Sequence, residues 1–181
     1  MSPMPQQTPG VSKQNYRTPK AFVRAVKQRF KINRFSHDFA ADSENTLAKT
    51  YFDEEMNAFG FSHWEDFCRD GWVWLNPPFA NIGDWAARCV QTSDAGGNVL
   101  LLVPAGVGAN WFRDYVHEKA QVLFLNGRLC FIDDWAMTID PASVKRGNPQ
   151  FYSSPPLYPK DCLLAVYGPN VTPGYRVWNW K

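Results

Sequence analysis

The sequence predicts a single doubly wound α/β domain with a mostly parallel sheet and helices on both faces. The chain has 181 residues, close to the common size of one domain. Continuous apolar runs such as V-L-L-L-V at residues 99–103 are typical of strands buried on both faces of a parallel sheet. These runs alternate with amphipathic helical segments, without internal repeats, and that alternation favours an α/β architecture.

The composition indicates a folded domain. Hydrophobic residues make up 45% of the chain and aromatic residues 15%, enough for a core, so disorder of the whole chain is excluded. No apolar run approaches the ~18 residues of a membrane span, and residues 1–10 lack the apolar region of a signal peptide. We expect residues 1–15 to be a flexible lead and 16–181 to be the domain. Scattered cysteines predict reduced thiols and no metal site: Cys68, Cys89, Cys130 and Cys162.

The first predicted helix starts at Thr18, as N-cap, and Pro19, at the first helical position. Phe22, Val26 and Phe30 then fall along one apolar face. A second stripe, spaced i, i+4, i+7 and i+11, is basic: Lys20, Arg24, Lys27 and Lys31. This stripe is either a solvated helix face or a face that contacts phosphates, and the pattern favours neither.

Two strand ends carry polar or small residues that suit a ligand site. Residues 35–39 alternate as a strand, followed by Ala40 and Ala41, and Asp42-Ser43 then caps a predicted short helix over 44–49. Residues 51–70 have no clear periodicity, apart from a short helix around 63–68. The strand 72–75 runs into N-P-P-F at 76–79. Because ligands in doubly wound sheets bind beyond the carboxyl ends of strands, both ends are candidates for one pocket.

The second half continues the alternation of strands and helices. The apolar positions of residues 82–90 and 111–116 predict helices, and residues 99–103 and 122–125 predict strands. Asn126-Gly127 predicts a tight hairpin turn with a partner strand over 129–132. Residues 133–160 predict a long loop, followed by a strand at 162–168 and an edge strand at 175–180.

The turn Asn76-Pro77-Pro78-Phe79 has a chemical interpretation. A conjugated amine on a purine or pyrimidine is a poor nucleophile, and two acceptors directed at its N–H groups stabilise the positive charge that develops as it attacks a methyl group. The Asn76 side-chain oxygen and the Pro77 carbonyl can supply those acceptors, because the prolines fix the backbone. Phe79 can stack on the ring. The alternative is a strand-terminating turn with a core phenylalanine.

In their order and spacing, several blocks of the chain resemble the phage-type DNA N6-adenine methyltransferases. The matching blocks span roughly residues 16–168. They are T-P-K at 18–20, F-S-H-D-F-A-A at 35–41 with N at 45, Y-F at 51–52, W-L-N-P-P-F at 74–79, L-L-V-P at 101–104, W-F at 111–112 and G-R-L-C-F at 127–131.

The resemblance implies a Rossmann-like class I methyltransferase that transfers a methyl group from S-adenosylmethionine to the N6 amine of a flipped adenine in double-stranded DNA. It implies no metal and no covalent intermediate. The implied cofactor-binding residues are Thr18, Pro19, Asp38, Ala40 and Asn57. The implied catalytic residues are Asn76, Pro77, Pro78 and Phe79. A bacteriophage origin, the cytoplasm of the bacterial host, a role against host restriction, GATC as recognition site and a monomer or weak dimer are expectations at the same level.

The sequence departs from the family pattern at two positions. Asn57 stands where the family often has an acidic residue that contacts adenosine, and Phe79 replaces the commoner tyrosine, which keeps stacking but loses a hydroxyl. Four other functions stay open: methylation of cytosine N4, of adenine in RNA, or of a protein glutamine amide, and a catalytically inactive DNA-binding or anti-restriction protein. Binding of S-adenosylmethionine would separate the enzymes from the last.

The sequence leaves no room for a recognition domain between Asp38 and Asn76, which are only 38 residues apart. We therefore predict that the 133–160 loop reads the DNA. The predicted DNA contacts are Lys20, Arg24, Lys27, Arg128, Lys145 and Arg146. For Arg128, an ion pair that ties its turn to a neighbouring carboxylate is an equally good interpretation.

Overall fold

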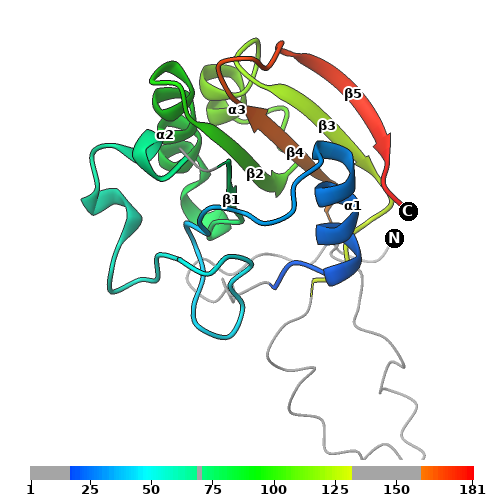
Figure 1. Ribbon diagram of the computed structural model, residues 1–181. Coiled ribbons are helices and arrows are strands. Elements are labelled where there is room, and N and C mark those ends of the chain that lie inside the picture. Colours follow the sequence, from blue (N-terminus) through cyan, green and yellow to red (C-terminus); the bar gives the residue numbers. More distant parts are fainter. Residues whose placement is uncertain (1–16, 69–70, 132–159) are drawn as a thin grey trace, which may run out of the picture.

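The computed structural model describes residues 17–68, 71–131 and 160–181 (Figure 1). The predicted flexible lead and nearly all of the predicted DNA-reading loop lie outside these residues. Two of the predicted DNA contacts, Lys145 and Arg146, lie outside them as well.

The described residues build a five-stranded sheet with the strand order β1-β2-β4-β3-β5. Its strands are β1 (Trp72–Leu75), β2 (Asn98–Pro104), β3 (Gln121–Asn126), β4 (Cys162–Tyr167) and β5 (Gly174–Asn179). β1 pairs with β2 and β3 pairs with β5 in parallel, whereas β4 is antiparallel to both of its neighbours. Four strands therefore share one direction, which confirms the predicted mostly parallel sheet, and β5 forms an edge as predicted.

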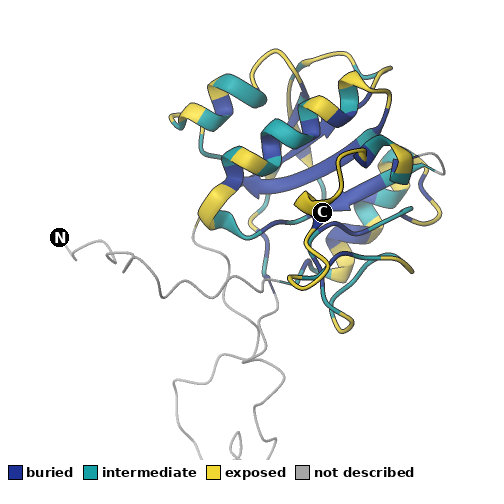
Figure 2. Cartoon of the chain, turned by 90° about the vertical axis from the view of Figure 1, so that its left-hand side faces the viewer, coloured by how far each residue is buried: buried dark blue, intermediate teal, exposed yellow. Residues whose placement is uncertain are grey.

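Helices cover both faces of the sheet, as predicted. On one face, α1 (Lys20–Phe30) buries Phe22 and Val26 against the sheet. On the other, α2 (Ile82–Asp94) and α3 (Asn110–Tyr115) bury Ala86, Cys89 and Phe112. Figure 2 shows the result, with buried strands between helices whose outer faces are exposed. Burial of each large apolar side chain contributes about 2 kcal/mol before entropy is counted.

Residues 35–51 continue the sheet beyond β1 without forming a named strand. Asp38 bridges Trp74 of β1 and Tyr51, both in parallel. The predicted helix over 44–49 is wrong, because the Asp42 carboxylate accepts the backbone N–H groups of Glu44 and Asn45 and so closes one isolated turn. The chain then becomes extended again.

Aromatic packing holds the irregular segment 52–68 at the edge of the sheet that β1 forms. It contains two short 3-10 helices, η1 (Ala58–Gly60) and η2 (Trp64–Cys68), the second of which matches the predicted short helix. The ring centroids of Phe39 and Trp64 lie 4.5 Å apart, and those of Phe39 and Phe52 lie 5.2 Å apart. This packing fixes residues 53–57 beside the end of β1.

The predicted hairpin at Asn126-Gly127 is wrong, because both edges of β3 are already paired. β4 occupies one edge and β5 the other, so residues 129–131 find no strand to join. Gly127 has a φ of +107°, and its carbonyl accepts a hydrogen bond of 2.7 Å from Trp180 Nε1. This positive φ, which glycine adopts at little cost, ends β3 and does not form a hairpin.

Candidate functional site

The two strand ends singled out from the sequence meet at one place. The backbone N–H of Phe39 donates to the carbonyl of Trp74 at 3.0 Å, so the chain after Asp38 runs beside the end of β1. Asn76 and Pro78, which follow β1, line a cavity of about 570 Å³ together with Ala40 and Ala41. A cavity of this size accommodates a ligand of cofactor dimensions.

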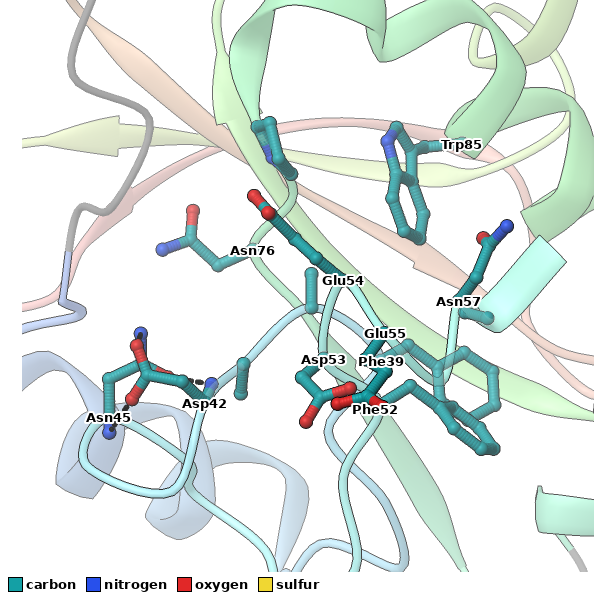
Figure 3. A pocket seen from close by; sticks show the side chains of 14 residues that line it. Phe39, Asp42, Asn45, Phe52, Asp53, Glu54, Glu55, Asn57, Asn76 and Trp85 are labelled. Carbon is teal, nitrogen blue, oxygen red and sulfur yellow. Dashed lines mark hydrogen bonds between the residues drawn. The ribbon is translucent and has the colours of Figure 1, made fainter.

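Carboxylates form one side of this cavity. Figure 3 shows Glu54 directed toward the middle, with Asp42, Asp53 and Glu55 around it. Four acidic groups in one cavity create a negative potential that attracts a cation. Carboxylates also accept hydrogen bonds from hydroxyl groups, including those of a ribose.

Aromatic side chains also line this cavity, and Figure 3 shows Phe39 and Phe52 beside Asp53 and Glu55. Phe39, Phe52 and Trp85 line the cavity, and Trp85 comes from α2. The Trp85 ring packs at 4.4 Å from the ring of Phe59, which limits its movement. Asn57, at the mouth, has a positive φ of 43° and caps η1 by accepting the N–H of Phe59. Aromatic faces with an amide nearby suit a planar, hydrogen-bonding ring.

Asn76 is held from the other side by the first helical segment. Its amide nitrogen donates to Thr18 Oγ1 at 3.2 Å. The predicted helix cap is therefore wrong: α1 begins at Lys20, Pro19 occupies the cap position, and no side chain caps the helix. Thr18 is buried, with 9% of its surface exposed. Its hydroxyl contacts Asn76 in the turn after β1 and leaves the helix terminus uncapped.

Asp38 is buried beside this contact rather than in the large cavity. Its carboxylate accepts the N–H of Leu47 at 3.0 Å and that of Ala40 at 3.4 Å. It lines a second cavity of about 10 Å³, which Thr18 and Asn76 also line. Burial raises the pKa of Asp38 from 3.8 to about 6 despite these two hydrogen bonds. Through its hydrogen bonds to Ala40 and Leu47, the Asp38 carboxylate holds the loop between them, which lines part of the large cavity.

The remaining residues of the turn take different positions. Pro77 is buried, and Pro78 lines the large cavity. Phe79 opens the 3-10 helix η3 (Phe79–Asn81), and its ring packs edge-on at 6.2 Å from the ring of Phe131. The large cavity thus receives Asn76 and Pro78 from the turn, while Phe79 contacts the hydrophobic layers beneath it.

The described cationic residues predicted to contact DNA differ in their surroundings. Lys20 and Arg24 are exposed on α1. The Lys27 ammonium lies 5.1 Å from the centre of the Phe35 ring, a contact that supports packing as well as solubility. Arg128 Nε lies 3.3 Å from Asp161 Oδ1, so the ion pair left open by the sequence is present.

Several cavity residues were missed by the sequence reading. They are Asp42, Asn45, Asp53, Glu54, Glu55 and Trp85. The acidic run D-E-E at 53–55, directly after Y-F, was the signal available for three of them. The sequence analysis does not assign this run to the site, because nothing local shows that the segment folds back over the end of β1.

All four cysteines are thiols without disulfide partners, as predicted. Burial raises the pKa of Cys68 to about 11 and that of Cys162 to about 12, so both stay protonated at neutral pH. Among residues 17–68, 71–131 and 160–181, no group of three or more His, Cys, Asp or Glu side chains is placed to hold a metal ion. In the same ranges, no helix has the length and apolarity to cross a membrane.

Comparison with known proteins identifies the family. Residues 6–146 match the family model described as DNA N-6-adenine-methyltransferase (Dam). The chain belongs to the Dam family. The match includes α1, the Asn76-Pro77-Pro78-Phe79 turn and the acidic run at 53–55, and confirms the resemblance drawn from the sequence motifs.

A relative of the chain comes from Escherichia phage T1. That protein, a DNA N-6-adenine-methyltransferase, is 21% identical over 122 residues, which are 67% of this chain and 49% of the relative. The chain thus aligns with about half the length of the phage protein.

Proposed function

We propose that this Dam-family chain is an S-adenosylmethionine-dependent DNA methyltransferase that modifies the N6 amine of adenine, on a Rossmann-like class I domain. The observation that carries the proposal is the shared cavity, where the Asn76-Pro77-Pro78 turn meets an acidic and aromatic wall. One part of this site suits a base amine and the adjoining part suits a cationic nucleoside. A methyl transfer needs the two parts side by side, so that the amine nitrogen and the methyl carbon lie about 3–3.5 Å apart.

The described residues fit S-adenosylmethionine. The cavity is large enough for it, and the four carboxylates complement its positive charge and its ribose hydroxyls. Phe39, Phe52 and Trp85 provide apolar faces for its adenine ring. When bound, S-adenosylmethionine supplies an electrophilic methyl group on a positively charged sulfur. Asp53, Glu54 and Trp85 are therefore added to the cofactor residues predicted from the sequence.

The chain's own contribution to the reaction is orientation and hydrogen bonding. Asn76 would accept an N–H from the target amine through its amide oxygen, and the Pro77 carbonyl would accept the second. Both acceptors stabilise the charge that develops on nitrogen as the bond to carbon forms. The target must leave the duplex to reach them, because its amine is paired inside the helix. The exocyclic amine needs no strong base beforehand, so a catalytic histidine is not required.

The same chemistry would serve N4 of cytosine or an adenine in RNA. The N6-adenine assignment is preferred because the family model and the phage T1 relative both carry that description. Recognition of GATC, reading of DNA by the 133–160 loop, and a role in protection from host restriction remain proposals of the same kind.

Analysis of the methylated product tests the proposal. Unmodified DNA is incubated with the full chain and S-adenosylmethionine labelled in the methyl group, then digested to nucleosides. We expect the label in N6-methyladenine. Label in N4-methylcytosine would identify cytosine as the acceptor, and label only when RNA replaces DNA would identify RNA as the substrate. DNA binding with neither label nor cofactor binding would overturn the proposal in favour of a binding protein.

The exposed cations of α1 are expected to contribute to DNA binding through phosphates. The plot of log affinity against log salt has a negative slope. Replacing Lys20 and Arg24 with alanine should make this slope less steep by about two, because the loss of two phosphate contacts leaves fewer counterions to be released on binding. The matched control is the double variant Arg113→Ala with Lys119→Ala, which removes one exposed cation from α3 and one from the turn after it. Equal slopes for both double variants, measured by fluorescence anisotropy across salt concentrations, would mean that α1 is only a solvated helix.

A further inference from the structure

The hydroxyl of Thr18 has an unusual partner. A threonine just before a helix normally accepts a backbone N–H of the first turn. In this chain α1 has no side-chain cap, and the Thr18 hydroxyl accepts a hydrogen bond from the side chain of Asn76, 58 residues away. The contact is shielded from water, since Thr18 is only 9% exposed.

A threonine hydroxyl can both donate and accept, so the atom of Asn76 that faces it decides which group the amide offers to a ligand. The terminal torsion of an asparagine is broad, so its amide can present either the oxygen or the nitrogen in a given direction. Only the oxygen accepts a hydrogen bond from an amine. Because the Thr18 hydroxyl takes the Asn76 nitrogen at 3.2 Å, the amide oxygen is the atom turned away from Thr18. Figure 3 shows the two amide atoms of Asn76 directed apart at the edge of the cavity.

Thr18 has a poor position for contacting a ligand in the large cavity. It does not line that cavity, whereas Asn76 does. Thr18 lines only the cavity of about 10 Å³, together with Asp38 and Asn76. That volume is about the space of one water molecule, too small for any part of a nucleoside. A cofactor-binding role for Thr18, implied by the family resemblance, therefore finds less support than a role through Asn76.

We propose that Thr18 is a positioning residue for the methyl transfer: its hydroxyl holds the Asn76 amide so that the oxygen is presented to the target amine. The inference rests on the proposed function for its catalytic consequence. Its structural part, the fixed amide, stands on the hydrogen bond alone. It also explains why the chain uses threonine before Pro19 although the helix is not capped by it.

The test compares variants that remove the hydroxyl or only the methyl group. Thr18→Val keeps the shape and loses the hydroxyl, whereas Thr18→Ser keeps the hydroxyl. Thr92→Val is the matched control, because Thr92 is also buried and its hydroxyl donates to the carbonyl of Arg88 within α2. For each protein, kcat and KM for DNA methylation, the Kd of S-adenosylmethionine, and the ¹⁵N and ¹H shifts of the Asn76 side-chain NH₂ group are measured.

We expect Thr18→Val to lower kcat about tenfold, as for the loss of one buried neutral hydrogen bond, with an unchanged Kd for S-adenosylmethionine and shifted Asn76 NH₂ resonances. Thr18→Ser should restore kcat and the resonances, and Thr92→Val should change neither. An unchanged kcat and unshifted resonances would overturn the inference, as would a weaker cofactor Kd with unchanged kcat. If Thr18→Val does not fold, Thr18→Ala carries the same comparison.

The two proposals fail in different ways. A wild-type chain that makes no methylated base would overturn the proposed function, and the Asn76 NH₂ resonances would still decide whether Thr18 fixes the amide. A wild-type chain that methylates DNA, with Thr18→Val equally active, would overturn only the role of Thr18.

Discussion

Replacing Asn76 with alanine is expected to lower kcat for DNA methylation by about a hundredfold or more, the cost of removing a hydrogen-bonding group aimed at developing charge. The variant loses the side-chain acceptor for the target amine and leaves the Thr18 hydroxyl without its donor. The Kd of S-adenosylmethionine should change little, because the carboxylates and aromatic rings of the cavity remain. Single-turnover methylation of a short duplex measures kcat, and equilibrium dialysis measures the Kd.

Asn179→Ala serves as the control for this result. Asn179 has the same side chain but is exposed on β5 at the edge of the sheet, and its removal is expected to leave kcat within a factor of about two. An Asn76→Ala protein that keeps wild-type kcat would show that the turn after β1 only terminates a strand. In that case the acceptor role would pass to another residue, and the proposed mechanism would be wrong.

The second large effect is expected in the pH dependence of stability, through Asp38. Its pKa in the folded protein is about 6, raised from 3.8 by burial. Between these two values the unfolded chain loses the proton while the folded chain keeps it, so stability falls as pH rises. We expect the free energy of unfolding to fall by about 2 kcal/mol through this one group between pH 4 and pH 7.

Comparison with Asp38→Asn isolates this contribution. The amide loses one acceptor for the N–H groups of Leu47 and Ala40, a cost that does not depend on pH. The difference between the two proteins should therefore shift by about 2 kcal/mol between about pH 4 and pH 7.5, with the wild type relatively more stable at low pH. Urea unfolding at intervals from pH 4 to pH 7.5 measures it. Parallel profiles for the two proteins would contradict a raised pKa at this carboxylate.

The strands and the larger helices were predictable because their signals are local. Apolar runs gave β2 and β4, and the spacing of Ile82, Ala86 and Cys89 gave α2. The failures share one cause, which is a group already engaged by another partner, distant in the sequence for Thr18 and β3 and local for Asp42. Thr18 serves Asn76 rather than its own helix, Asp42 closes a turn instead of starting a helix, and β3 has no edge left for a hairpin.

The candidate site was predicted only in part, because some of its residues carry a local signal in the sequence and others do not. Asn76 stood out because an asparagine and two prolines after a buried strand form a local and rare combination. The carboxylates of Asp53 and Glu54 did not, since only the packing of Phe39 on Phe52 and Trp64 brings their segment over the end of β1. Contacts of this kind depend on the whole fold and leave no periodicity in the sequence.

The position of β4 in the sheet has a consequence for how the chain folds. β2 and β3 do not pair with each other, and both depend on β4, which enters the chain only at Cys162. During synthesis, the backbone N–H and C=O groups of β2 and β3 that pair with β4 have no partner until that strand has been made. Such long-range closure slows folding and exposes unpaired edges to aggregation. The last strands of this chain therefore complete its sheet, although the turn at residues 76–79 is synthesised long before them.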